Sequence, residues 1–232
     1  MLVVLASRYD ASCQRFITGK AADARLLTCR DLSVRGWQYD PGSEVRTSVI
    51  GGRLTGADEI DGVLTRLPSV VASELADIVP RDQNYAAAEM TAFLSAWLSD
   101  LRCPVLNQPT PVCLMGPNWR KEKWIHTAAK LGITVVPARR SVPAAIDAQP
   151  HDLPPGSATV NVIGDLCVGI ADQSLGKSAR ALAEAAGVDL LRARFTSPAA
   201  GSAFLGADYW VDINDPEVSE AVWNYFAGGR RR

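Results

Sequence analysis

Apolar runs of strand length alternate with amphipathic stretches along the first half of the chain. Strands are predicted at residues 1–7, 24–32 and 60–68, where most positions are apolar. Asp10 can begin a short helix, and residues 82–101 carry a broad apolar stripe at helical spacing. Because strands and helices alternate, this half predicts an α/β domain with a mostly parallel sheet.

Turn residues predict two hairpins. Residues 36–55 alternate apolar and polar positions around Pro-Gly and Gly-Gly pairs, and residues 158–172 form two strand-like runs around Gly164-Asp165. The remaining pattern predicts helices at 70–79, 118–132, 177–189 and 216–228, and strands at 103–109, 133–139, 190–197 and 209–215.

A stretch rich in Pro and Ala divides the chain. Residues 140–157 have no apolar periodicity and are expected to form a linker. The expected organisation is an α/β domain at 1–117, a connecting helix and strand at 118–139, this linker, and an α+β domain at 158–232.

Composition excludes several classes of protein. The 232 residues are 47% hydrophobic, and 24 basic against 25 acidic residues leave a net charge of −1, so no field draws the chain to nucleic acid or to a membrane surface. The apolar runs are too short to span a bilayer, and the N-terminus has no basic region typical of a signal peptide. Five dispersed cysteines without a CxxC pair indicate reduced thiols and a cytoplasmic protein.

Aromatic residues provide candidate partner surfaces. Trp119 and Trp124 are five positions apart, so both cannot face one narrow helical stripe, and at least one is expected to be exposed or in an interface. Trp37 and Tyr39, in the first predicted hairpin, are further candidates for a peptide or partner surface. Cations accompany the tryptophans at 119–124, but one short segment in a nearly neutral chain does not indicate a nucleic-acid partner.

The order of several short motifs resembles the ATP-grasp superfamily. The likeness is closest to the branch that contains the ribosomal-protein glutamate ligase and the graspetide (microviridin-type) macrocyclases. It runs along nearly the whole chain and rests on "GVLTRLP" (62–68), "RDQNYAAAEMTAFLSAWLSDLRCPVLNQP" (81–109), "NWRKEKWIHTAAKLGITVVPAR" (118–139), "VNVIGDLCVGIA" (160–171) and "VDINDP" (211–216).

The resemblance implies a fold and a chemistry. The fold would be an N-terminal pre-ATP-grasp-like, mostly parallel sheet followed by a shortened α+β ATP-grasp-like part. In the family, lysines of a small subdomain reach the phosphates of ATP, and acidic and asparagine side chains hold magnesium. The bound nucleotide then activates a carboxylate as an acyl phosphate, which an amine or hydroxyl attacks.

Two departures put that chemistry in doubt. Residues 138–158 stand where the family has a whole phosphate-binding subdomain, and they contain no lysine and no glycine-rich loop. Only Lys121, on the helix at 118–132, matches a family lysine. It is either a residual phosphate contact or a solvated lysine within a charged run.

The metal-binding positions of the family are also altered. In the resemblance, Arg194 takes the place of the first acidic ligand, Asp212 replaces the glutamate and Asn214 matches the asparagine. A fixed positive charge repels a divalent cation, so a degenerate site without metal is expected, with an ion pair between Arg194 and Asp212 on neighbouring strands. The alternative is that Asp212 and Asn214 still hold magnesium.

The leading hypothesis is therefore a truncated, catalytically inactive ATP-grasp-like protein without a cofactor. It would bind a leader or precursor peptide, or a partner enzyme, in ribosomal-peptide natural product biosynthesis. The alternatives are an ATP- and magnesium-dependent carboxylate–amine or carboxylate–hydroxyl ligase with a rebuilt or partner-completed nucleotide site, and a purely structural subunit. A homodimer is also expected, because the chain carries six tryptophans and the stripe of helix 82–101 is wide enough for both core and interface.

Overall fold

The structure is a computed structural model with two compact units. The first unit consists of Met1–Asn118 and Asp212–Arg232, and the second of Trp119–Val211. Most of the expected linker at 140–157, including His151, lies outside the described residues, as do Arg230–Arg232. The described residues are 1–18, 24–41, 46–137, 154–169 and 172–228.

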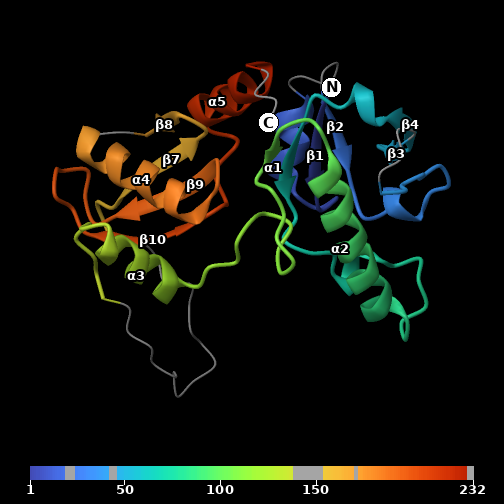
Figure 1. Cartoon of the computed structure of the whole chain (residues 1–232), viewed down its shortest axis with the longest axis horizontal. Helices are drawn as coiled ribbons and strands as arrows, with labels where there is room; N and C mark the ends of the chain where they lie inside the picture. The colour runs from blue at the N-terminus through green and yellow to red at the C-terminus, as the bar shows by residue number, and fades with distance from the viewer. Residues whose placement is uncertain (19–23, 42–45, 138–153, 170–171, 229–232) are drawn as a thin grey trace. The chain divides into compact units, whose positions relative to one another are not determined.

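A four-stranded sheet forms the centre of the first unit (Figure 1), and all its strand pairs are parallel. The predicted parallel α/β domain is thus confirmed. All five residues of the central β1 are buried, as expected of a parallel strand with both faces covered. The strand order is β2-β1-β5-β6, with bounds β1 Leu2–Ala6, β2 Ala24–Leu27, β5 Gly62–Arg66 and β6 Val105–Leu106.

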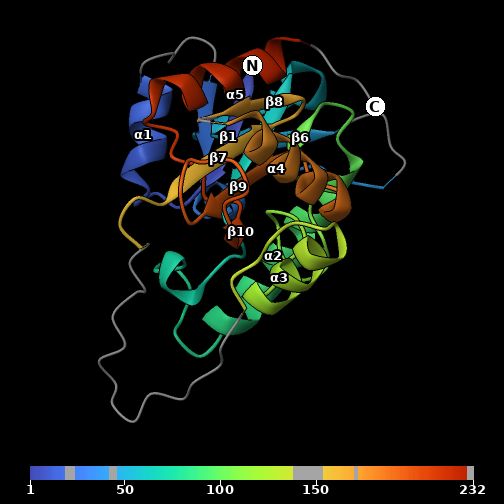
Figure 2. The ribbon, with the colours of Figure 1, turned by 90° about the vertical axis from the view of Figure 1, so that its left-hand side faces the viewer.

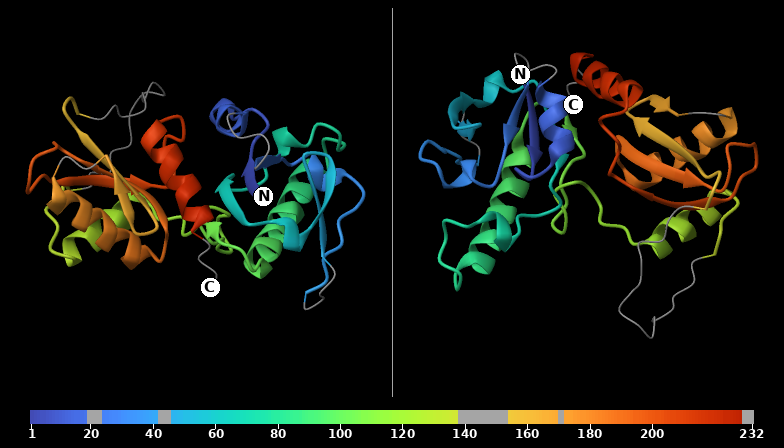
Figure 3. Two further views of the ribbon diagram at one scale, coloured as in Figure 1. Left: turned by 90° about the horizontal axis from the view of Figure 1, so that it is seen from above. Right: turned by 180° about the vertical axis from the view of Figure 1, so that it is seen from behind.

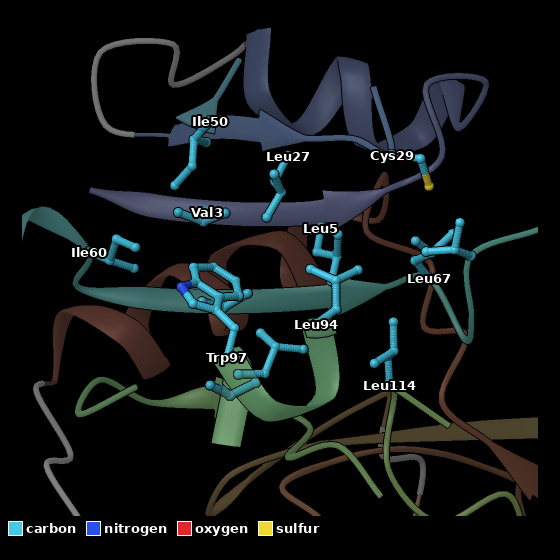
Figure 4. Packing of buried hydrophobic residues seen from close by; sticks show 14 of the residues in the cluster. Val3, Leu5, Leu27, Cys29, Ile50, Ile60, Leu67, Leu94, Trp97 and Leu114 are labelled. Carbon is cyan, nitrogen blue, oxygen red and sulfur yellow. The ribbon is translucent and has the colours of Figure 1, made fainter. Parts of the chain in front are cut away.

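One face of this sheet is covered by α2 (Gln83–Asp100), which confirms the long helix predicted at 82–101. Leu94 and Trp97 of this helix are buried in one apolar cluster with Leu5 of β1 (Figure 4). The apolar stripe of the helix therefore faces its own sheet over most of its length.

Two helices from the ends of the chain pack together in the first unit (Figure 2). The ring of Phe16 in α1 (Ala11–Thr18) stacks on that of Trp223 in α5 (Pro216–Ala227), with 5.2 Å between centroids. At Gly62 in β5, an added Cβ would lie 2.1 Å from the ring of Phe226. A side chain at this position would collide with α5, so glycine allows the close packing of helix on strand.

The first predicted hairpin is confirmed, with its turn at the Gly-Gly pair. Strands β3 (Thr47–Ile50) and β4 (Arg53–Gly56) pair antiparallel. Gly51 and Gly52 have φ angles of 58° and 72°, which a two-residue turn with two left-handed positions requires.

The second unit is an antiparallel sheet with helices on one side, and its strand order is β10-β9-β7-β8. The predicted hairpin around Gly164 is confirmed by the pairing of β7 with β8. Viewed from behind, the sheet stands in front of α4 (Figure 3). The elements are α3 Lys121–Lys130, β7 Ala158–Ile163, β8 Leu166–Val168, α4 Gln173–Ala186, β9 Leu190–Phe195 and β10 Phe204–Asp208.

The strand predicted at 209–215 is wrong, because β10 ends at Asp208. Tyr209, Val211 and Ile213 are buried while the residues between them are exposed, which explains the strand-like alternation in the sequence. The polar positions bond locally instead, and the Asp212 carboxylate accepts the Asn214 backbone N–H at 3.0 Å. Such hydrogen bonds between a side chain and a backbone group two residues away compete with pairing to a neighbouring strand.

Several shorter elements also differ from the prediction. The helix predicted at 70–79 is reduced to a single 3-10 turn at Ala72–Glu74. The strand predicted at 133–139 makes one isolated bridge, from Val135 to Phe204. The strand predicted at 103–109 is reduced to β6 at Val105–Leu106, and Pro104, directly before it, cannot donate to a ladder. Among the described helices, none has the length and apolar content needed to cross a membrane.

Candidate functional site

Arg194 lies on β9 and has a carboxylate partner on the adjacent strand. Its Nη1 donates to Oδ2 of Asp208 at 2.7 Å. The prediction that Arg194 pairs with Asp212 is therefore wrong. That prediction assumed a strand at 209–215, whereas the strand beside β9 is β10, which ends at Asp208.

A second arginine shares the same carboxylate. Nε of Arg192 donates to Oδ1 of Asp208 at 3.0 Å and Nη2 donates to Oδ2 at 2.9 Å, a two-point contact typical of guanidinium and carboxylate. The side chains of Arg192, Arg194 and Asp208 are 30%, 26% and 25% exposed. Two positive charges and one negative charge leave one net positive charge on this part of the sheet.

The alternation of β9 places both arginines on the same face. Leu191, Ala193 and Phe195 are completely buried, whereas Arg192 and Arg194 are partly exposed. In the neighbouring strands, Gly206 stands opposite Arg194 and Asn161 stands opposite Arg192. We refer to the face formed by Asn161, Arg192, Arg194, Gly206 and Asp208 as the arginine face.

Asn161 is the least satisfied polar group on the arginine face. The residue is 9% exposed, and its Oδ1 accepts no hydrogen bond from any described residue. A buried carbonyl oxygen without a donor is costly, so this atom marks a place where a ligand or a water molecule can donate a hydrogen bond.

Asp212 and Asn214 belong to the first unit, where their side chains hold the chain against α1. Oδ1 of Asn214 accepts from Nε of Arg15 at 3.0 Å, and its Nδ2 donates to Ser12 Oγ at 2.8 Å and to Asp212 Oδ1 at 3.1 Å. Each polar atom of the amide thus already has a partner. The side chains that match the metal positions of the family make structural hydrogen bonds instead.

The described residues offer few side chains that could together bind a metal ion. No group of three or more His, Cys, Asp or Glu side chains there has the geometry to hold a metal ion. Arg15 donates to the very oxygen of Asn214 that a cation would need. The residues present therefore do not fit magnesium, which requires several oxygen ligands.

Lys121 and His126, both on α3, lie at the surface. Lys121 is the first residue of this helix, follows the N-cap Arg120 and is exposed. His126, on the same helix, is also exposed. Neither side chain makes a hydrogen bond or an ion pair with another described residue, so their positions favour solvation.

Trp119 and Trp124 lie together in the second unit. Trp124 is 1% exposed, with its ring centroid 4.7 Å from that of Trp119 and 6.1 Å from that of Tyr209. Trp119 is partly exposed, and the Lys123 ammonium lies 5.1 Å from the centroid of its ring. Only Trp119 of this pair is accessible to a partner.

Trp37 and Tyr39 pack inward from the first hairpin region. Trp37 makes edge-to-face contacts with Phe93 and Trp97 at centroid distances of 5.2 and 5.6 Å. The hydroxyl of Tyr39 donates to Asp100 at 2.9 Å, and burial together with this hydrogen bond raises the pKa of Tyr39. These rings fix the hairpin region on α2 and are partly buried there.

An open groove of about 560 Å³ lies along a different stripe of α2. None of its described lining residues is charged, and most have small side chains. Val71, at its edge, is 47% exposed, and Val112, next to the lining residue Pro111, is 71% exposed. The lining includes Val70, Val71, Ala87, Ala88, Thr91 and Ala92.

Cys13, Cys29 and Cys103 have no environment that would activate a thiol. Burial raises the pKa of Cys13 to about 12 and that of Cys29 to about 12, and Glu74 contributes to the second of these shifts. The pKa of Cys103 is raised to about 11, again mainly by burial. Thiols with such values stay protonated and serve as small apolar core residues.

Sequence reasoning missed Arg192, Asp208 and Asn161. The sequence did contain one usable signal, because two arginines at positions i and i+2 of a strand must lie on one face and require a counter-charge. Asp208 supplies that counter-charge, but the strand that carries it was predicted several residues too late.

The fold of the chain is ATP-grasp-like. No protein-family profile matches the sequence, and a comparison with curated proteins gives no match either. Solved structures of ATP-grasp ligases, in contrast, match over nearly the whole of both chains, and this likeness confirms the fold that the sequence motifs implied.

Three of these structures illustrate the likeness. The macrocyclase MdnC of Microcystis aeruginosa MRC, bound with precursor peptide MdnA, matches with a TM-score of 0.66 and 11% identity over 100% of both chains. The ATP-grasp ligase PsnB, complexed with precursor peptide PsnA2 and AMPPNP, matches with 0.62 and 16% over 97% of this chain and 98% of PsnB. A RiPP-associated ATP-grasp ligase of Chryseobacterium gregarium, in complex with ADP and a leader and core peptide, matches with 0.62 and 9% over 100% and 98%.

Double-mutant cycles test which carboxylate holds Arg194. The pair Arg194→Ala and Asp208→Ala should show a coupling free energy of about 0.5–3 kcal/mol, because the two groups share a partly buried hydrogen bond. The matched pair Arg194→Ala and Asp212→Ala should be additive within about 0.5 kcal/mol. Both cycles are measured by urea denaturation.

Coupling to Asp212 that equals or exceeds coupling to Asp208 would contradict the observed pairing. As a control on charge, Arg194→Asp should lower the free energy of unfolding more than Arg194→Ala, since it places a second carboxylate beside Asp208.

Proposed function

We propose that this chain is a catalytically inactive ATP-grasp-like protein that binds a leader or precursor peptide, or a partner enzyme, of a ribosomal-peptide biosynthetic pathway. The fold alone does not carry this function, because one fold hosts many activities. The observation that carries it is the pair of arginines that share Asp208, which puts fixed positive charge at the position the resemblance assigns to a metal ligand.

Three further features support the loss of ligase chemistry. The amide of Asn214 is bonded to Arg15, Ser12 and Asp212, and its oxygen accepts from the positively charged Arg15, which disfavours a cation there. Lys121 is a single exposed lysine, a weak phosphate site without backbone donors or metal. The stretch 138–158 contains no lysine that could replace the missing phosphate contacts.

Two observations support peptide binding. Structures with the same fold have been solved with precursor or leader peptides bound, among them MdnC and PsnB. The groove along α2 has the uncharged lining and the size that suit an apolar peptide segment. We therefore assign the peptide to this groove, in place of the hairpin region of Trp37 and Tyr39, whose rings are packed inward.

Calorimetry with ATP tests the absence of ligase activity. The full chain should show no magnesium-dependent ATP binding and no ADP release, alone or with a candidate peptide, because Arg194 repels a divalent cation and magnesium is needed to neutralise the transferring phosphoryl group.

ADP release that requires magnesium and disappears in Asp212→Ala, but not in the exposed control Asp58→Ala, would contradict the proposal. That result would instead support an ATP-dependent ligase with a rebuilt or partner-completed nucleotide site.

Peptide binding is tested with short peptides encoded beside the gene. Labelled peptides are titrated with the full chain and followed by fluorescence anisotropy. Ala92→Trp, which fills the groove, should weaken binding at least about tenfold, because a bulky ring removes the space for an apolar side chain worth 1.4 kcal/mol or more.

The matched control is Ala96→Trp, at an exposed position of the same helix that does not line the groove. Equal affinities of the two variants would exclude the groove as the peptide site. The absence of any binding peptide would favour a purely structural subunit.

We further propose that the chain forms a homodimer, although most of the stripe expected to serve it is used in the core. Trp97 is 3% exposed, while Tyr85 is 71% exposed and Val79 is 55% exposed near the start of α2. Light scattering should give about twice the 24.9 kDa of one chain. Tyr85→Asp should lower that mass, whereas Leu54→Asp on the hairpin should not. A wild-type mass near that of one chain would exclude the dimer.

A further inference from the structure

The second unit contains an open pocket of about 250 Å³, which is lined by residues of β8 and α4. Its lining combines one thiol, two cations, one amide side chain and a glycine. No acidic side chain is among the described residues that line it. We refer to it as the thiol pocket, and its members are Cys167, Gln173, Gly176, Lys177 and Arg180.

Helical spacing gathers the polar members of the thiol pocket on one side of α4. Gln173, Lys177 and Arg180 stand at positions i, i+4 and i+7, so their side chains follow one face of the helix. Gly176 is buried beside them and has no side chain. Cys167 Sγ can therefore approach the helix backbone, and it donates to the Gly176 carbonyl oxygen at 3.7 Å.

The sulfur of Cys167 is both accessible and next to positive charge. The residue is partly exposed. Arg180 Nη2 donates to Cys167 Sγ at 3.9 Å, and it also donates to the Asp165 carbonyl oxygen, which holds the guanidinium beside the sulfur. Lys177 is exposed about one helical turn before Arg180. A reagent that reaches this thiol from solvent thus meets two cations.

Cys103 provides an internal comparison. It is also partly exposed, but burial raises its pKa to about 11, and the nearby carboxylate of Asp61 adds to the rise. The two thiols are therefore similar in exposure and differ in their surroundings, since Cys167 shares its pocket with Lys177 and Arg180.

The two cations determine which reagent the thiol pocket favours. A thiolate attacks a disulfide, and a small disulfide that carries carboxylates is attracted to Lys177 and Arg180. A guanidinium can in addition hold a carboxylate through two parallel N–H groups. We propose that Cys167 is a site of reversible modification by a small anionic disulfide, which the cations of the thiol pocket bind and orient.

The reaction is a thiol–disulfide exchange. Cys167 loses its proton, and its sulfur attacks one sulfur of the reagent, whose S–S bond breaks as the new S–S bond forms. The leaving thiolate takes up a proton. Cys167 is oxidised to a mixed disulfide, one half of the reagent is reduced to a thiol, and an excess of small thiol reverses the step. This inference goes beyond the proposed function, because the thiol pocket shares no residue with the groove on α2 or with the arginine face.

Mass spectrometry of the reduced full chain tests the inference. The probes are glutathione disulfide, both halves of which carry carboxylates, and cystamine, a cationic disulfide. Reactions at low salt are quenched with acid, and peptide mapping locates the adducts. Each rate is divided by the rate of N-acetylcysteine with the same probe, which removes the reactivity of the reagent itself. Cys167 should form a mixed disulfide before Cys103 does, and its normalised rate should be higher with glutathione disulfide than with cystamine.

Variants of the cations test the role of the pocket. Lys177→Gln should lower the normalised rate with glutathione disulfide about threefold, since a single exposed charge contributes little more than that. It should not lower the rate with cystamine, which the lysine repels. Arg180→Gln should also slow the reaction with glutathione disulfide. The matched control is Lys130→Gln, an exposed lysine outside the pocket, which should leave both rates unchanged. Melting curves of all variants confirm that the fold is retained.

The adduct should be absent in Cys167→Ser, and added salt should reduce the preference for the anionic probe. The inference is overturned if Cys167 stays unmodified or if Cys103 reacts first. Equal normalised rates with the two probes also exclude it, as does equal slowing by Lys177→Gln and Lys130→Gln.

Discussion

Arg192 and Arg194 stand two residues apart on one strand, so their like charges face the same side of the sheet and need a carboxylate nearby. Asp208 on β10 is that carboxylate. The strand register places it opposite Arg192 and places Gly206 opposite Arg194. A slip by one residue would turn Asp208 toward the face covered by helices, where Leu191, Ala193 and Phe195 are buried. The ion pairs and the apolar residues of β9 therefore specify the same strand register.

The same charges limit the chemistry that this part of the fold can support. A carboxylate at position 194 could bind a cation, whereas a guanidinium repels one and binds an anion. In the first unit, the oxygen of the Asn214 amide accepts from the positively charged Arg15, which disfavours a cation beside it, and the amide nitrogen donates to Ser12 and Asp212. These two independent features both support the proposal that the chain lacks metal-assisted phosphoryl chemistry.

Much of the fold could be predicted from the sequence because local signals and burial agreed. The continuous apolar run of β1, the Gly51-Gly52 turn and the left-handed Gly187 that ends helix α4 each have a direct local cause. The start of α4 was predicted too late, at residue 177, whereas the helix begins at Gln173 with Asp172 as its N-cap. The failure that affected the candidate site has a local cause as well. Residues 209–215 alternate like a strand because their buried side chains face a core, yet their backbone makes no ladder, while the true strand β10 contains Gly206 and shows little alternation. The wrong partner of Arg194 followed from that single misplaced strand.

The arginine face also shows how one strand can separate the residues that secure a fold from the residues that carry charge. The chain keeps the backbone arrangement of peptide-binding ligases at only 9–16% identity in the three structures compared. In β9, the residues that secure the core and the residues that meet a ligand lie on opposite faces, because strand side chains alternate. Substitution of one outward residue therefore costs the core nothing, provided that a counter-charge such as Asp208 is present. The buried face of β9 secures the fold, and the charge on its outward face can differ without any change to that core.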